Sequence, residues 1–103
     1  MTEPMRLRAQ MKGDIAEIKV MMMHPMENGK RKGADGKIVA PHFIQQISVE
    51  VGGKLVIQEQ NGTALSLNPV FTFKVKGVKA GEKVVLKWND SNGESRTDET
   101  TIG

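Results

Sequence analysis

The chain has 103 residues, 38% hydrophobic and 26% charged, so its length and composition fit one folded domain covering residues 1–103. It has no cysteine, which excludes disulfides, zinc–thiolate sites, iron–sulfur clusters and thiol nucleophiles. The net charge of +3 is a mild excess of basic residues, and no apolar run reaches the roughly 18 residues that would span a bilayer.

Apolar and polar residues alternate along the first part of the chain, which predicts β-strands. A first strand is predicted over residues 5–10 and a second over residues 16–23, with a turn at Gly13-Asp14 between them. The second strand ends at His24-Pro25, because proline cannot continue an interior ladder. Residues 24–42 form a long polar loop, and we expect its tip at residues 33–37 to cap a short hairpin.

Five more strands are predicted, at residues 43–51, 55–60, 71–76, 83–88 and 94–102. Tight turns are predicted at Gly52-Gly53, at Asn61-Gly62 and at residues 90–93, and residues 63–69 are interpreted as a connector. About seven short strands without a helical period predict an all-β fold, an immunoglobulin-like antiparallel β-sandwich with Trp88 in its core.

Lysines are scattered along these predicted strands, and aromatic residues are only 4% of the chain. Because nucleic-acid binders gather basic residues on one face, often beside aromatic groups, we expect no nucleic-acid partner. The run Lys30-Arg31-Lys32 is interpreted as a solvated loop tip, whereas residues 89–103 carry four acidic residues and one basic residue.

The two histidines lie at opposite ends of the same loop, where His24 and His42 could approach each other. With Glu27 they supply the minimum ligand set for a single metal ion, but their spacing matches no compact ligand motif. We therefore expect no metal and no cofactor, and predict that the imidazoles hydrogen-bond the loop or face a partner.

Four of the seven methionines lie in residues 21–26, where thioethers and an imidazole are ligands that suit Cu(I). The alternative function is therefore a periplasmic copper-binding β-sandwich that uses Met21, Met23, His24 and Met26. Consecutive strand residues point to opposite faces, so Met22 is predicted in the core and Met21 and Met23 on a partner-facing surface.

No arrangement typical of catalysis is found, and we expect no enzyme activity. Asp98 and Glu99 are adjacent, so on a strand they point apart and cannot act as paired carboxylates. A third class, an adhesion-like or carbohydrate-binding sandwich, would need an exposed aromatic platform, which we do not expect from Phe43, Phe71, Phe73 and Trp88.

Several segments resemble the SoxZ family, the Z subunits of a bacterial sulfur-oxidation carrier. The resemblance rests on Glu3-Pro4-Met5-Arg6-Leu7-Arg8-Ala9, His24-Pro25-Met26-Glu27-x-Gly29 followed by Arg31-Lys32, Pro41-His42-Phe43-Ile44, Asn68-Pro69, Phe71-x-Phe73-x-Val75-x-Gly77 and Arg96-Thr97-Asp98-Glu99. These segments follow the family order along essentially the whole chain, and the His-Pro-Met-Glu and Arg-Thr-Asp-Glu runs are the most specific.

The resemblance implies a non-catalytic, immunoglobulin-like subunit that pairs with a Y subunit as a heterodimer or heterotetramer. In this family the Y subunit carries sulfur from thiosulfate on a cysteine of its flexible, glycine-rich C-terminal arm, which then visits the other Sox enzymes. The setting is the periplasm, and a Z chain is exported with its signal-bearing partner. The first residues here, Met1 to Arg6, likewise show no signal-peptide pattern.

Covalent sulfur carriage needs a thiolate, so this chain cannot hold the cargo itself. We predict that the partner interface lies at the long loop and the strand after it, at Met23, His24, Met26, His42 and Phe43. In this loop apolar groups stand beside polar ones, away from regular alternation. The isolated chain is expected to form a homodimer through the same surface.

Overall fold

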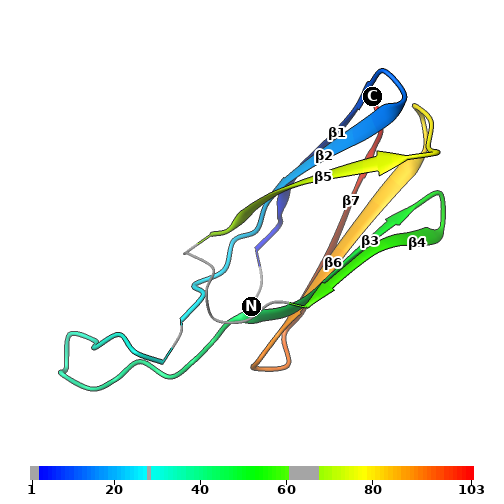
Figure 1. The fold of residues 1–103 in the computed structure, drawn as a ribbon. Coiled ribbons are helices and arrows are strands. Elements are labelled where there is room, and N and C mark those ends of the chain that lie inside the picture. Colours follow the sequence, from blue (N-terminus) through cyan, green and yellow to red (C-terminus); the bar gives the residue numbers. More distant parts are fainter. Residues whose placement is uncertain (1–2, 28, 61–67) are drawn as a thin grey trace.

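The computed structural model describes residues 3–27, 29–60 and 68–103, and these residues form seven β-strands (Figure 1). The strands are β1 (Arg6–Lys12), β2 (Ile15–Met21), β3 (Ile44–Val51), β4 (Lys54–Gln60), β5 (Val70–Lys76), β6 (Lys83–Asp90) and β7 (Ser95–Thr101). The all-β prediction is confirmed, with strand ends within two residues of those expected. The turn predicted at Asn61-Gly62 and most of the 63–69 connector lie outside the described residues. No helix long and apolar enough to cross a membrane occurs in the described part of the chain.

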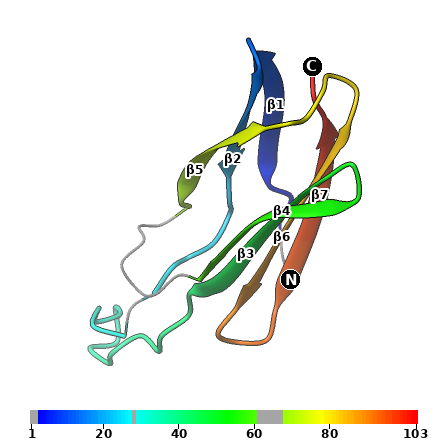
Figure 2. The same ribbon diagram turned by 45° about the vertical axis from the view of Figure 1, so that its right-hand side comes forward.

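The strands pair antiparallel in two sheets, one with the order β1-β2-β5 and the other with the order β4-β3-β6-β7. The sheets lie on opposite sides of the molecule in two views, as in an immunoglobulin-like β-sandwich (Figures 1 and 2). Inward-facing side chains of both sheets fill the space between them, among them Ile18, Val20, Met22, Ile47, Val49, Leu86 and Trp88. Trp88 is 1% exposed and Met22 is fully buried, so both core predictions are confirmed.

The third strand departs from strict alternation. Its pairing with β6 shifts between Ile44 and Gln46, so that Ile44 and Ile47, three positions apart, are both fully buried. A β-bulge inserts one extra residue and re-aims the side chains that precede it. The bulge therefore turns Ile44 into the core, where a period of two would leave it facing outward.

The two sheets are joined at the edge formed by β1 and β7. The amide of Met11 donates to the carbonyl of Gly103 at 2.9 Å, and the amide of Gly103 donates to the carbonyl of Ala9 at 2.9 Å. Nearby, Arg96 makes a bidentate ion pair with Asp98 at 2.8 and 3.0 Å, and Asp98 also accepts the amide of Met5 at 2.9 Å. The Arg-Thr-Asp-Glu segment thus has a structural role: it ties the start of β1 to β7.

Candidate functional site

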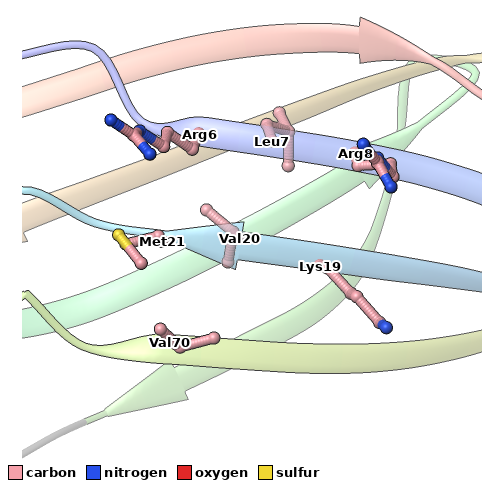
Figure 3. Close-up of a pocket in the computed structure, with 7 residues that line it drawn as sticks. All are labelled: Arg6, Leu7, Arg8, Lys19, Val20, Met21 and Val70. Carbon is pink, nitrogen blue, oxygen red and sulfur yellow. The ribbon is translucent and has the colours of Figure 1, made fainter.

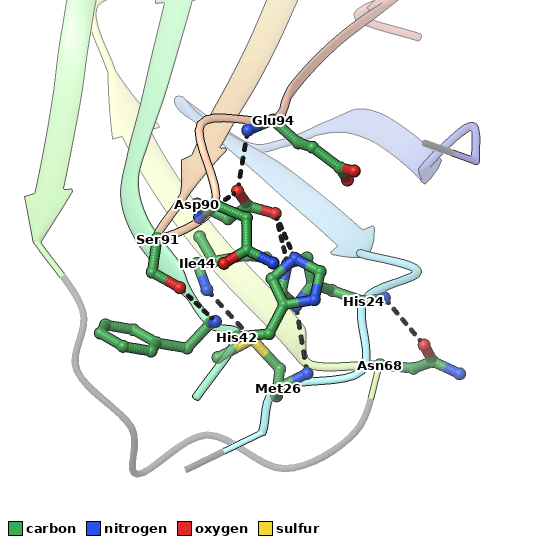
Figure 4. Close-up of polar contacts among 10 residues, drawn as sticks. His24, Met26, His42, Ile44, Asn68, Asp90, Ser91 and Glu94 are labelled. Carbon is green, nitrogen blue, oxygen red and sulfur yellow. Dashed lines mark hydrogen bonds and ion pairs between the residues drawn. The ribbon is translucent and has the colours of Figure 1, made fainter. Parts of the chain in front are cut away.

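A buried carboxylate organises the end of the sandwich from which the long loop leaves. The Oδ2 atom of Asp90, at the end of β6, lies 2.9 Å from His24 Nε2 and 2.7 Å from His42 Nε2 (Figure 4). Its Oδ1 atom accepts the amides of Asn92 and Glu94 at 3.0 and 2.9 Å. One carboxylate therefore fastens both ends of the loop to the β6–β7 turn, and we call these three residues, His24, His42 and Asp90, the clamp.

The hydrogen bonds of the clamp define the tautomer of His24. The amide of Met26 donates to His24 Nδ1 at 3.1 Å, so that nitrogen carries no proton and Nε2 is the donor to Asp90. Only 3% of His24 is exposed, and both of its ring nitrogens find partners within the protein. Burial alone would raise the pKa of the Asp90 carboxyl, but the hydrogen bonds from His24, His42 and the two turn amides outweigh burial and lower that pKa.

The geometry of the clamp also bears on metal binding. The ligand atoms of His24, His42 and Asp90 lie within 4.8 Å of one another, which is the spacing of a three-residue metal site. A metal on His24 Nε2 would move the imidazole proton to Nδ1, which then could not accept the amide of Met26. The carboxylate that meets the two histidines is Asp90, whereas Glu27, the carboxylate weighed from the sequence, pairs with Arg31 at 2.7 Å.

The loop between the histidines forms a narrow two-stranded ribbon that projects from the sandwich (Figures 1 and 2). We call residues 25–27 and 29–42 the ribbon. Its base is closed by paired backbone bonds between Glu27 and His42 at 2.7 and 2.9 Å, and its tip by the amide of Gly33 donating to Lys37 at 2.8 Å. The predicted hairpin tip at residues 33–37 is confirmed. The molecule measures 51 × 22 × 20 Å, and the ribbon extends its long dimension.

Glycine is required at one point of the ribbon. Gly29 has a φ of +82°, and a Cβ built on it would lie 2.8 Å from Cγ of Pro41 on the opposite side of the ribbon. A larger residue would therefore both strain the backbone and push the two sides of the ribbon apart. This accounts for the glycine of the His-Pro-Met-Glu-x-Gly segment.

Most of the ribbon is exposed to solvent. Residues 30–32, the Lys-Arg-Lys run, are all exposed, as expected for a loop segment. Ile38 is 63% exposed and is the most exposed of the large apolar side chains in the described part of the chain. The ribbon thus exposes an apolar side chain and several cations to solvent, because it projects beyond the two sheets of the sandwich.

The five residues predicted at the partner interface all lie where the ribbon leaves the sandwich, and we call Met23, His24, Met26, His42 and Phe43 the root. His24 and Met26 are buried at 3% and 7% exposure, whereas Met23, His42 and Phe43 are partly exposed. Met26 has a φ of +49°, rare for a residue with a side chain, and its sulfur accepts the amide of Ile44 at 3.4 Å. The approach of the two histidines is confirmed, with ring centroids 4.6 Å apart.

Sequence reasoning missed Asp90, which was read only as the first residue of a turn. It lies 66 residues from His24 and 48 residues from His42 in the chain. The only local signal is the turn itself, in which an Asp side chain commonly accepts the amide two residues later. That turn uses one carboxylate oxygen, and the other remains available to the histidines.

Several of the groups considered for other functions make contacts within the chain. Of the four copper-ligand candidates, His24 has both ring nitrogens in hydrogen bonds, so Cu(I) on His24 would have to break one of them, and the Met26 sulfur accepts the amide of Ile44. Phe71 and Phe73 stack with ring centroids 5.8 Å apart, but Phe73, like Trp88, is buried. Asp98 and Glu99 point to opposite sides of β7, as predicted.

The comparison with known families identifies the chain. Residues 5–101 match the family model described as Sulphur oxidation protein SoxZ. No curated protein sequence matches the chain. The family match covers nearly every described residue, including the clamp, the ribbon and strands β1 and β7. SoxZ proteins are periplasmic and pair with SoxY. The chain therefore belongs to the SoxZ family, as the non-catalytic Z subunit of the SoxYZ sulfur carrier in thiosulfate oxidation.

Proposed function

We propose that this chain holds its SoxY partner through the ribbon and the root. The observation that supports this most is the ribbon itself, which projects from the sandwich with Ile38 63% exposed while its base is fastened by the clamp. A projecting segment that buries little of its own surface gains stability when a partner covers it.

Within the root we assign two kinds of role. Met23, His42 and Phe43 are partly exposed and would touch the partner directly. His24 and Met26 are buried and would act through the ribbon, because they set the direction in which it leaves the sandwich. Two hydrogen bonds join the backbone of Phe43 to Ser91: the Ser91 hydroxyl accepts the Phe43 amide at 3.1 Å, and the Ser91 amide donates to the Phe43 carbonyl at 2.9 Å.

The division of labour follows from the lack of a thiol. Sulfur bound covalently to a protein side chain needs a thiolate, and this chain has no cysteine. The cargo therefore belongs to the partner's cysteine, and this chain supplies a rigid platform that also meets the other Sox enzymes in passing. We propose that it reaches the periplasm by export together with its partner.

The test compares two exposed aliphatic residues in the assembled carrier. Ile38→Ser removes the apolar side chain of the ribbon, and Leu55→Ser removes one of similar exposure, 52%, from the β4 edge. We expect Ile38→Ser and Phe43→Ala to weaken binding to SoxY about tenfold or more, as for residues at the centre of an interface, and Leu55→Ser to have little effect. Isothermal titration of each variant with purified SoxY measures this.

Equal affinity for wild type, Ile38→Ser and Phe43→Ala would remove the ribbon from the interface. Substitution of the buried residues by His24→Ala or Met26→Ala is expected to weaken binding as well, with a loss of thermal stability that Ile38→Ser does not cause. Phe43→Ala is expected to cost some stability, because Phe43 packs partly against the core. Circular dichroism of each free variant separates the two groups.

A further inference from the structure

One face of the molecule concentrates positive charge. On the three strands β1, β2 and β5, every second residue points away from the core, and the register places these residues side by side in rows. Six of these outward residues are cations, namely Arg6, Arg8, Lys12, Lys19, Lys74 and Lys76. Glu17 is the one acid among them, and it lies 3.3 Å from Lys12 and 3.5 Å from Lys19. We call this surface the basic face.

The expectation that lysines are merely scattered along the strands is wrong for this face. Six of the fifteen Lys and Arg residues lie here with one of the twelve acidic residues. The face therefore carries more positive charge than the +3 of the whole chain, and the remainder of the chain is acidic on balance. Antiparallel pairing of β1, β2 and β5 gathers cations from sequence segments about 60 residues apart.

The basic face also has an apolar centre near one end. A shallow depression there is bordered by the outward side chains of Met21 and Val70, with Arg6, Arg8 and Lys19 around it, and by the inward-facing residues Leu7 and Val20 between them (Figure 3). Val70 is 62% exposed and Met21 is partly exposed, and the two lie in one row with Arg6. An apolar centre within a charged rim is the usual anatomy of a protein–protein contact.

We propose that the basic face docks an acidic protein surface that places an apolar side chain over Met21 and Val70. This rests on the proposed function, because the occupant to which we commit is an enzyme that acts on the carrier's sulfur group. A carrier that visits several enzymes needs fast and reversible contacts, and complementary charge raises the association rate more than it slows dissociation. No residue that points outward from these three strands is aromatic, so the face lacks the stacking groups typical of a surface for single-stranded nucleic acid.

The face is distinct from the surface proposed for SoxY. The ribbon and the root lie beyond the end of β2, whereas the basic face lies along the three strands themselves. The apolar centre is the part of the face nearest the root, since Met21 is two residues from Met23, so the test below measures SoxY binding as well as enzyme binding.

The test uses the intact carrier, this chain with SoxY, and the purified enzymes that load or hydrolyse the sulfur group. Arg8→Glu combined with Lys74→Glu reverses two charges on the basic face. Lys54→Glu combined with Lys87→Glu makes the same change in net charge on β4 and β6, where both lysines are exposed. Biolayer interferometry at low and high salt measures the dissociation constant and the association rate constant of each carrier–enzyme complex.

We expect the basic-face pair to raise the dissociation constant for at least one of these enzymes about tenfold at low salt and to flatten its dependence on salt. The control pair should change it by no more than about twofold. Val70→Ser should weaken binding at both salt concentrations, because it removes an apolar contact that salt does not screen.

Three results would overturn the inference. The first is equal enzyme binding by the basic-face pair and the control pair. The second is loss of SoxY binding in the basic-face pair, which would make this face part of the SoxY interface. The third is unchanged enzyme binding together with loss of binding to phosphatidylglycerol vesicles or to a DNA duplex, which would assign the charge to a membrane or to nucleic acid. Failure of the wild-type chain to bind SoxY would instead contradict the proposed function.

Discussion

Replacing Asp90 by asparagine tests whether the clamp stabilises the fold. In the wild type two oxygens accept four hydrogens, from the Nε2 atoms of His24 and His42 and from the amides of Asn92 and Glu94. Asparagine has one oxygen and one amino group, so whichever way it turns, its amino group faces two donors. Either the histidines or the turn amides then lose their acceptor.

The size of the effect follows from burial. His24 is 3% exposed, so water cannot replace its lost acceptor, and an unsatisfied buried donor costs about 1–3 kcal/mol. A second lost hydrogen bond, one to a charged acceptor, adds a similar amount. We therefore expect Asp90→Asn to lower the free energy of unfolding by about 3 kcal/mol, or the melting temperature by about 15 °C for a domain of this size.

Glu99→Gln is the matched control, because it also neutralises a carboxylate near the end of the chain. Glu99 is 60% exposed and lies 3.6 Å from Lys83, a surface pair whose loss costs about 0–1 kcal/mol. Urea unfolding at neutral pH, followed by circular dichroism, measures both variants. If Asp90→Asn loses no more stability than Glu99→Gln, the clamp does not hold the loop as argued.

Three further predictions concern the pH dependence of stability, the core and self-association. Because the pKa of Asp90 is lowered in the fold, its carboxylate stabilises the fold above the unfolded-state pKa of about 3.9, and this contribution is lost as pH falls through the folded-state pKa. Acid should therefore destabilise wild type more steeply than Asp90→Asn. Urea titrations at a series of pH values measure this, and parallel curves for the two proteins would contradict it. Met22→Ala should lower the free energy of unfolding by about 3 kcal/mol, because Met22 is fully buried, whereas Met21→Ala on the outer face should lower it much less. Similar losses for both variants in denaturant unfolding would refute the assigned faces. The isolated chain should self-associate with rising concentration in light scattering, and Ile38→Ser should abolish this; a variant that still associates would place the contact elsewhere.

Local pattern accounts for the parts of the fold that were predicted. Alternation in a strand depends on neighbouring residues alone, so it located all seven strands and placed Met22 and Trp88 in the core. The exception is β3, where a bulge turned Ile44 inward, because a bulge depends on the pairing with β6 and not on the residues of β3 alone.

The candidate site could be predicted only in part. The polar loop between His24 and His42 marked where the ribbon and the root would lie, and the approach of the two imidazoles follows from their position at the two ends of one loop. The carboxylate could not be predicted: Glu27, the acidic residue nearest in sequence, is bound by Arg31 four residues away, while the histidines meet Asp90.

The sequence by itself determined the class of fold, the absence of a thiol and the membership of a carrier family, since each of these depends on composition or on short segments read in order. Tertiary structure alone decided which carboxylate joins the histidines and that six cations share one face. Both depend on the order in which the strands pair, which brings together residues 48 to 66 positions apart at the clamp and sets β1 and β5 on either side of β2. A pattern of neighbouring residues contains no information about such distant pairings.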